Sequence, residues 1–220
     1  MAIHILQADN NDTPPRRFNG EELVVATHNK GKLREIRELF GDRVKKLSAA
    51  SDYGLESPAE TGTTFVENAL IKAQYVAQQT GKVALADDSG ICIAAIDGQP
   101  GVYAADWAEK PDGTRDFGMA MQKVKDAIDQ KPGGWDAAPK EAYFVSCLAM
   151  AWPDGHAEVV EGYSHGTIVW PPRGDKGFGY DPMFVPKNGT QTYGEMEPQQ
   201  KHETNHRAES FKKLIARCFP

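Results

Sequence analysis

Two adjacent aspartates interrupt one of the most apolar stretches of the sequence, VALADDSGICIAA, which runs from residue 83 to residue 95. The runs on either side are rich in valine, isoleucine and alanine, as strands that cross a core are. The Ser-Gly pair that follows Asp87 and Asp88 is a turn signal. We therefore expect a strand, a turn and a second strand. Two like charges at the edge of a core also require a chemical explanation.

Apolar residues elsewhere in the sequence recur at the spacing of amphipathic helices. A short apolar run over residues 23–26 precedes the first of these, which predicts a strand, a polar turn and a helix up to Phe40. Thr64 and Glu67 fit a capping box at the start of a second helix that Gly81 ends. Two further helices are expected, one with its apolar face over residues 117–128 and a last one over residues 211–218.

The segment EAYFVSCLAMAWPDGHAEVVEGYSHGTIVW predicts two long strands joined by the turn residues Pro153-Asp154-Gly155. The whole order is mixed α/β, but strands and helices do not alternate strictly. A purely parallel, doubly wound sheet is therefore not expected. The predicted fold class is α/β, with a mixed sheet flanked by helices.

The chain of 220 residues is long enough for one large domain or two small lobes. We expect residues 1–20 to form a loose extension that ends in Pro-Pro-Arg-Arg, and residues 21–220 to form the domain. The first twenty residues lack the basic start and apolar length of a secretory signal. No apolar run approaches the roughly 18 residues that span a membrane, so no membrane partner is expected.

Charge and cysteine content limit the class of partner and the compartment. The formal net charge of −6 argues against sequence-independent binding to nucleic acid, although a small anion needs only a few local cations. Cys92, Cys147 and Cys218 are an odd number, far apart and each among apolar residues. This pattern indicates buried free thiols in a reducing compartment, and so a cytoplasmic protein.

Two polar stretches precede expected helices. ATHNKGK, residues 26–32, offers a hydroxyl, an amide, a flexible glycine and a cation at a helix N-terminus, where anions are favoured. It lacks the upstream glycine of a Walker A loop, and an ordinary capped turn is the alternative. Glu60 precedes the second helix and is either a cap or a ligand. Lys72, between Ala69 and Ala73, is either a snorkelling surface lysine or a cation that a ligand approaches closely.

Three further polar stretches could carry chemistry. Asp87 and Asp88 would face opposite sides of an extended strand, so one could hold a divalent cation while the other orients the loop; an Asx turn is the alternative. GDKGFGYDP, residues 174–182, could bring backbone and aromatic rings close to a flat ligand, or could be a hairpin with core aromatics. KHETNHR, residues 201–207, adds cations and donors, but taken alone it is a solvated run.

Together these stretches supply what a nucleoside triphosphate site requires: cations, carboxylates for magnesium and an aromatic surface. Their order along the chain also matches a known family. ATHNKGK, ETGTTFVENALIKA, ADDSG, GQPGVYAADWA, KGFGYDP and NHRAESFKKL occur in that order. From about Leu23 to its end, the chain resembles the inosine triphosphate pyrophosphatase family. The resemblance implies an elongated mixed α/β fold of two lobes with a central cleft, and a homodimer.

The resemblance also implies the role of each site residue. The phosphate and metal groups would be Thr27, Asn29 and Lys32 on the triphosphate, Glu60 and Asp88 with Mg²⁺, Asp88 as activator of the attacking water, and Lys72 as a counter-charge. The substrate and base contacts would be Ser89, Phe178, Gly179, Tyr180, Asp181, Lys201, His206 and Arg207. Asn205 departs from the serine that many members carry directly before the histidine.

The implied reaction is hydrolysis of non-standard purine nucleoside triphosphates (ITP, dITP, XTP) to the monophosphate and pyrophosphate. A 6-keto group would accept from a donor such as His206 or Arg207, and the 6-amino group of adenine would leave that donor unpaired. GTP shares the 6-keto group, so its rejection would require exclusion of the 2-amino group. Two alternatives stay open: a pyrophosphatase for pyrimidine or modified nucleotides, and a nucleotide-binding protein without turnover.

Overall fold

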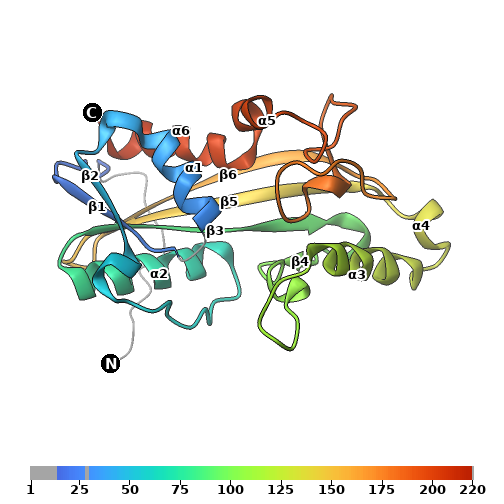
Figure 1. The fold of residues 1–220 in the computed structure, drawn as a ribbon, viewed down its shortest axis with the longest axis horizontal. Coiled ribbons are helices and arrows are strands. Elements are labelled where there is room, and N and C mark those ends of the chain that lie inside the picture. The colour runs from blue at the N-terminus through green and yellow to red at the C-terminus, as the bar shows by residue number, and fades with distance from the viewer. Residues whose placement is uncertain (1–13, 28–29, 220) are drawn as a thin grey trace. The chain divides into compact units, whose positions relative to one another are not determined.

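A computed structural model of the chain describes residues 14–27 and 30–219 (Figure 1). The chain divides into two compact units. Within the described residues, unit 1 comprises residues 14–27, 30–88, 146–162 and 210–219, and unit 2 comprises residues 89–145 and 163–209. Strands β3, β5 and β6 contribute residues to both units.

Seven strands within the described residues form one sheet in the order β2-β1-β3-β5-β6-β7, and β4 pairs with β3 off this path. Their bounds are β1 Glu22–Val25, β2 Lys46–Ala49, β3 Val83–Ile93, β4 Pro100–Gly101, β5 Glu141–Ala151, β6 Ala157–Ile168 and β7 Phe184–Pro186. β1 pairs in parallel with β2 and with β3, whereas β3–β4 and β6–β7 are antiparallel. The predicted mixed sheet with flanking helices is confirmed, and the elongated shape and the cleft stay predictions.

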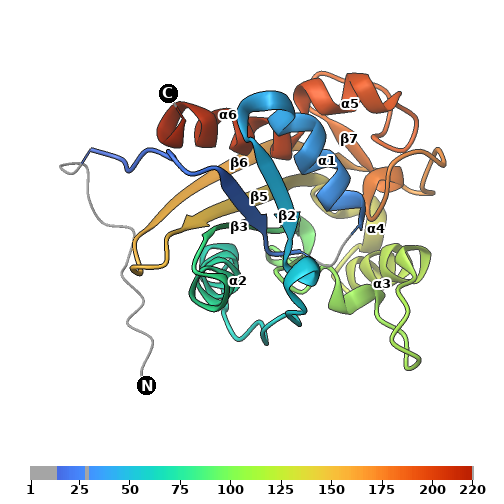
Figure 2. The same ribbon diagram turned by 60° about the vertical axis from the view of Figure 1, so that its left-hand side comes forward.

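In unit 1, alternate residues of each strand enter different helical layers. Leu23, Val25 and Leu85 lie in a cluster with residues of α1 (Lys30–Phe40) and α6 (His206–Cys218). Val24 and Ala84 lie in the other cluster, with α2 (Phe65–Thr80). Figures 1 and 2 show α1 and α6 on one side of these strands and α2 on the other. The two faces of these strands therefore pack against different helices.

The predicted capping box of α2 is confirmed. The Thr64 hydroxyl accepts from the Glu67 amide at 3.1 Å, and the Glu67 carboxylate accepts from the Thr64 amide at 3.1 Å. Gly81 ends the helix in the left-handed region, with φ 66°. The buried face of α2 is rich in alanine, which lets the helix approach the strands closely.

Unit 2 is built around one apolar cluster to which strands and a helix contribute. Val124 and Ile128 of α3 (Phe117–Asp129) are buried in it with Ile91, Phe144 and Phe184. Within the described residues the chain also forms two shorter helices, α4 (Gly134–Ala137) and α5 (Pro198–Thr204). Short 3₁₀ turns cover Gly41–Arg43, Ala50–Tyr53, Ala94–Ile96, Asp106–Ala108 and Asp181–Met183.

The expected strand, turn and strand around Asp87 and Asp88 is wrong. β3 continues without interruption through both aspartates, Ser89 and Gly90 to Ile93. Both acids are buried, at 3% and 7% exposure, and each carboxylate is paired with a lysine. Because the charges are compensated inside unit 1, the backbone can stay extended where the turn signal suggested a reversal.

Two further expectations, the turn between the long strands and the buried cysteines, are confirmed. β5 and β6 are joined at Pro153-Asp154-Gly155, where Gly155 has φ 91°. The three cysteines are free and buried, as predicted. The short elements β2, β4, β7, α4 and α5 had no clear sequence signal. Within the described residues no helix has both the length and the apolar character needed to cross a membrane.

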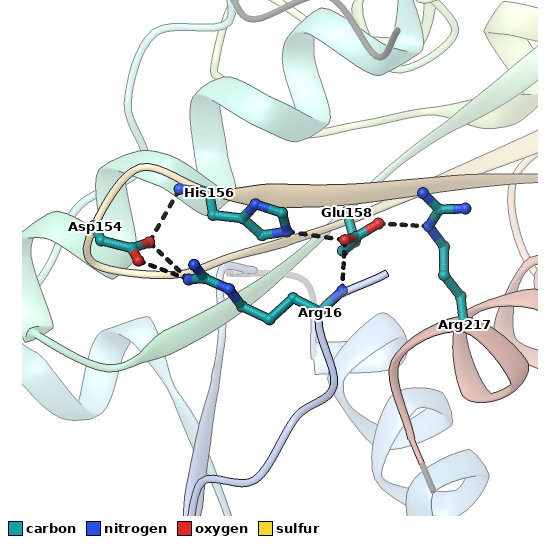
Figure 3. A network of polar contacts seen from close by, with 5 residues as sticks. All are labelled: Arg16, Asp154, His156, Glu158 and Arg217. Atoms are coloured by element: carbon teal, nitrogen blue, oxygen red, sulfur yellow. Dashed lines mark hydrogen bonds and ion pairs between the residues drawn. The ribbon is translucent and has the colours of Figure 1, made fainter. Parts of the chain in front are cut away.

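Residues 16–18, at the end of the expected loose extension, pack against other residues of unit 1. Phe18 is buried beside Phe219, with ring centroids 5.3 Å apart, and its amide donates to the Cys218 carbonyl. The Arg16 amide donates to the buried carboxylate of Glu158, as Figure 3 shows. Residues 16–18 are therefore part of the packed structure of this unit.

Candidate active site

The two adjacent aspartates of β3 face opposite helical layers of unit 1. Asp87 lies 2.5 Å from Lys32 Nζ of α1, through Oδ2. Asp88 lies 2.8 Å from Lys72 Nζ of α2, through Oδ1. Strand geometry alone produces this division, because successive side chains point to opposite faces. Each acid thus meets a cation from a different helix.

The second oxygen of Asp88 is unusual. The atom Oδ2 is buried, yet it accepts no hydrogen bond from any residue that the structure describes. Burial raises the pKa of this carboxyl to about 6, although the ammonium of Lys72 lowers it. Buried polar atoms are ordinarily paired, so an orphaned carboxylate oxygen points to a missing proton donor or cation.

Lys72 and Glu60 complete this group. Lys72 is 7% exposed on α2, and its ammonium also lies 3.3 Å from Glu60 Oε1. Burial lowers the pKa of Lys72, but Asp88 and Glu60 outweigh it and the net shift is upward, so the side chain stays charged. The Glu60 side chain is 44% exposed and can therefore reach solvent or a ligand.

The ATHNKGK stretch is only partly within the described structure. Thr27 follows β1 and is half-buried, and the Lys32 side chain is 18% exposed at the start of α1. Asn29 lies outside the described residues. Lys32, Lys72 and the carboxylates of Glu60 and Asp88 place cations and hard oxygen ligands in one unit. Such groups suit a phosphate chain and a divalent cation.

Unit 2 carries a second group, formed around Phe178. The Phe178 side chain is exposed, and the cations of Lys201 and Arg207 lie 4.7 and 5.7 Å from its ring centroid. Asp181 holds both Lys201 and the backbone at Phe178. Its Oδ2 accepts from Lys201 Nζ at 2.6 Å and from the Phe178 amide at 2.8 Å. Burial raises the pKa of Asp181, against the opposing effect of Lys201. An exposed ring held beside two cations can stack on a flat ligand.

Steric constraints explain why glycine occurs in the loop of residues 174–182. Gly177 has φ +76°, and a Cβ placed there would lie 2.1 Å from Asp181 Oδ2. Any side chain at this position would therefore displace the carboxylate that holds Lys201. Gly179 also has a positive φ, of 69°.

The residues at the start of α6 lie in the same unit. His206 is 5% exposed and stacks on Phe144, with centroids 4.9 Å apart and planes 12° apart. Arg207 is 2% exposed and donates to the Ser89 hydroxyl at 3.3 Å. Asn205 Oδ1 accepts from the Ala208 amide at 2.8 Å, which is an N-cap contact. Asparagine and serine cap equally well, which explains why this departure from the family pattern is tolerated.

Tyr180 is placed differently from its neighbours in the sequence. It is 3% exposed, and its hydroxyl donates to the Ala104 carbonyl at 2.9 Å. Its ring packs edge-on against Phe117, at 5.7 Å between centroids. The structure thus brings Phe178, Asp181, Lys201 and Arg207 together, whereas the Tyr180 side chain is buried in the core of unit 2.

Two residues that contact the candidate site residues were not predicted from the sequence. Ser146 donates to Asp87 Oδ1 at 2.8 Å, and Phe144 stacks on His206. Both lie in the apolar run FVSCLAMAW of β5. A hydroxyl in a fully buried strand was the available signal for Ser146, because buried polar groups need a partner. No signal in the sequence pairs Phe144 with His206.

Unit 1 thus holds cations and carboxylates, and unit 2 holds an exposed aromatic ring beside two cations. Comparison with known proteins identifies the family. The model of the Ham1 family matches residues 23–217, and the chain belongs to this family.

Individual relatives cover nearly the whole chain. It is 49% identical over 207 residues to a dITP/XTP pyrophosphatase from Rhodospirillum centenum, covering 94% of this chain and 99% of that protein. A dITP/XTP pyrophosphatase from Mesorhizobium japonicum is 50% identical over 205 residues, 90% of this chain and 93% of the relative. The solved structure of a HAM1 protein from Coxiella burnetii has a TM-score of 0.81 at 35% identity, covering 90% of this chain and 98% of the other.

Proposed function

We propose that the protein hydrolyses non-standard purine nucleoside triphosphates, namely ITP, dITP and XTP, to the nucleoside monophosphate and pyrophosphate. The observation that carries the proposal is the unsatisfied Oδ2 of Asp88, which lies in the same unit as two buried or half-buried lysines. The full-length similarity to proteins named dITP/XTP pyrophosphatase supports it.

In this proposal the unit 1 group acts on the phosphate chain. A water oxygen forms a bond to the α-phosphorus, and the bond from that phosphorus to the oxygen bridging to the β-phosphorus breaks. Pyrophosphate leaves with the bridging oxygen, and Oδ2 of Asp88 takes a proton from the water. A base with a pKa of about 6 is ionised at neutral pH and still accepts a proton readily. Lys32 and Lys72 stabilise the charge that develops on the leaving group.

The donor set fits a magnesium ion. Among the described residues no group of three or more His, Cys, Asp or Glu side chains forms a cation cage. Mg²⁺ does not require one, because it takes one or two carboxylates and completes its shell with water and substrate phosphates. Glu60 and the carboxylate of Asp88 would hold it, and the 44% exposure of the Glu60 side chain, which leaves its oxygens open to a cation, is the observation that fits. When bound, the ion would neutralise phosphate charge and polarise the phosphoryl oxygens.

The unit 2 group recognises the base in this proposal. Phe178 offers a stacking surface, and His206 and Arg207 offer donors to a 6-keto group, with Ser89, Asp181 and Lys201 supporting them. Adenine carries a donor at that position, so ATP would leave a buried protein donor unpaired. That loss amounts to about 1–3 kcal/mol per group.

We also propose that the protein is a cytoplasmic homodimer. The resemblance to the inosine triphosphate pyrophosphatase family supports the dimer, and the three buried free thiols support a reducing compartment. Light scattering of the purified protein at several concentrations tests the dimer.

The experiment that tests the reaction measures pyrophosphate release from ITP, dITP, XTP, GTP, ATP and dTTP, each with and without magnesium. We expect fast, magnesium-dependent release from ITP, dITP and XTP, and little from ATP or GTP. Release from dTTP alone would instead support a pyrimidine nucleotide pyrophosphatase. If no nucleotide is hydrolysed while ITP still binds in calorimetry, the protein is a nucleotide-binding protein without turnover.

A further inference from the structure

A chain of buried polar groups runs through unit 1 behind Lys32. Lys32 Nζ lies 2.5 Å from Asp87 Oδ2, and Asp87 Oδ1 accepts from the Ser146 hydroxyl at 2.8 Å. The Ser146 hydroxyl is in turn 3.0 Å from that of Ser210. The four residues come from α1, β3, β5 and α6, so they join distant parts of the sequence.

Lys32 is the one partly exposed member of this chain, and the three residues behind it are buried. The Lys32 side chain is 18% exposed and the Asp87 side chain 0%, and Ser146 and Ser210 are each 0% exposed. A ligand can therefore contact Lys32, but not the groups behind it. An unpaired buried carboxylate would be strongly unfavourable, so the contacts of Asp87 with Lys32 and Ser146 are what make its position tolerable.

Asp87 and Asp88 differ in what their oxygens contact. Both oxygens of Asp87 have partners, whereas Asp88 Oδ2 has none within the described residues. Asp88 can thus accept a proton or a cation, whereas both oxygens of Asp87 are already engaged, one of them by Lys32. A lysine side chain has four rotatable bonds, so a fixed carboxylate removes most of its freedom before a ligand arrives.

On the basis of the function proposed above, we propose that Ser146 and Asp87 are positioning residues for substrate binding: Ser146 fixes the carboxylate of Asp87, and Asp87 fixes the ammonium of Lys32 for the phosphate chain. Ser210 supports the Ser146 hydroxyl from α6. The relay acts on the phosphate end of the substrate, so it affects affinity for phosphates and leaves base selectivity unchanged.

The test is a double-mutant cycle with two readouts. Wild type, S146A, K32A and the S146A/K32A double variant are assayed for kcat and KM with ITP and magnesium. Calorimetry measures the binding of inorganic pyrophosphate to each. We expect S146A to lower kcat/KM about tenfold, as loss of one hydrogen bond to a charged group does, mainly through KM. Pyrophosphate affinity falls by a similar factor. In the K32A background, S146A has no further effect on either quantity.

Unit 1 provides a matched control. Ser48 is 5% exposed and donates to the Glu22 carboxylate at 2.6 Å, and Glu22 also pairs with Lys46 at 2.9 Å. This group repeats the lysine, carboxylate and serine of the relay, away from the aspartates of β3. We expect S48A to leave kcat/KM and pyrophosphate affinity unchanged, and every variant to keep the wild-type ratio of ITP to ATP hydrolysis.

Several outcomes would overturn the relay. These are unchanged kinetics in S146A, losses that multiply in the double variant, an altered ITP to ATP ratio, or no binding of pyrophosphate by the wild type. If the wild type binds pyrophosphate but releases none from any nucleotide, the proposed hydrolysis fails while the calorimetric cycle still decides the relay. Should S146A not fold, D87N replaces it in the same cycle, with the same expected loss and non-additivity.

Discussion

Two buried carboxylates of unit 1 have opposite surroundings. Glu158 on β6 is 4% exposed, and both of its oxygens have donors (Figure 3). Oε1 accepts from the Arg16 amide at 2.8 Å and contacts His156 Nε2 at 2.8 Å, and Oε2 accepts from Arg217 Nε at 2.5 Å. Asp88 is nearly as buried, at 7%, but its Oδ2 has no partner among the described residues.

The pKa shifts of the two groups reflect this difference. Burial raises the pKa of Glu158, but its hydrogen bonds from Arg16, His156 and Arg217 outweigh this and the net shift is downward. For Asp88 burial outweighs the effect of Lys72, and the pKa rises to about 6. A fully paired buried carboxylate stabilises a fold, whereas a partly paired one is available for chemistry. The contacts of Glu158 in Figure 3 are therefore structural. The unpaired oxygen of Asp88 marks the proposed site instead.

The largest expected effect is on turnover in D88N. The amide has the shape of the carboxylate but cannot take a proton from water. We expect kcat for ITP to fall by about 10²–10⁴-fold, the range that general-base catalysis contributes. Binding of ITP, measured by calorimetry, should persist.

The matched control is E158Q, which makes the same kind of change at the other buried carboxylate. It should keep the turnover of the folded protein. An undiminished rate in D88N would exclude Asp88 as the base, and an equal loss of turnover in E158Q would remove the distinction between the two groups.

E158Q should instead lower stability. The amide leaves one of the donors around Glu158 without its charged acceptor, and hydrogen bonds to charged groups contribute about 1.5–3 kcal/mol each. Because Arg217 is 43% exposed and water can solvate it, we expect the lower part of this range. For a domain of this size that corresponds to a fall in Tm of roughly 3–6 °C, measured by calorimetric or circular dichroism melts. An unchanged Tm would contradict the structural role.

How far the sequence predicts these groups depends on the distance over which each signal acts. Local signals succeeded: the capping box at Thr64, the turn at Pro153-Asp154-Gly155 and the helical periodicities all lie where expected. The turn expected after Asp88 failed because the deciding contacts, with Lys32 and Lys72, come from helices far along the chain. Turn propensity is a local preference, and buried ion pairs override it.

The candidate site shows the same limit. The sequence order of six motifs pointed to the family, and the family model matches residues 23–217. The Ser146 contact with Asp87 and the Phe144 contact with His206 join residues about 60 positions apart, and no local pattern encodes them. Arg16, expected in a loose extension, contacts Glu158 across 142 positions of sequence. Such contacts depend on the tertiary fold, which brings segments distant in the sequence together.

The pH dependence of stability should have opposite signs for the two carboxylates. The pKa of Asp88 is raised from 3.8 to about 6, so the folded state binds this proton more tightly than the unfolded state. The stability it contributes is full below pH 4 and is lost as the pH rises to 6. In chelator-treated protein, we expect the stability of wild type relative to D88N to fall by about 1–3 kcal/mol across this range.

Glu158 should behave in the reverse way. Its pKa is lowered from 4.5, so its stabilisation is present above that value and is lost as the pH falls. The stability of wild type relative to E158Q should therefore shrink in acid. Urea unfolding at a series of pH values measures both differences. Equal signs for the two carboxylates would show that Asp88 is as fully compensated as Glu158.

The smallest expected effect distinguishes the two arginines around Glu158. Arg217 donates to the carboxylate through its side chain, whereas Arg16 does so through its backbone amide. The Arg16 side chain instead reaches the exposed Asp154 at 2.7 Å and lies over the Trp152 ring at 5.4 Å.

R16A keeps the amide contact, and exposed ion pairs contribute little to stability. We therefore expect R16A to leave Tm within about 2 °C of wild type, because one exposed pair typically contributes less than about 1 kcal/mol. R217A should lower Tm further, because it removes a donor to a buried charge. A larger loss in R16A than in R217A would mean that the N-terminal segment is held mainly by its side chains, and that the contacts of Glu158 are secondary to them.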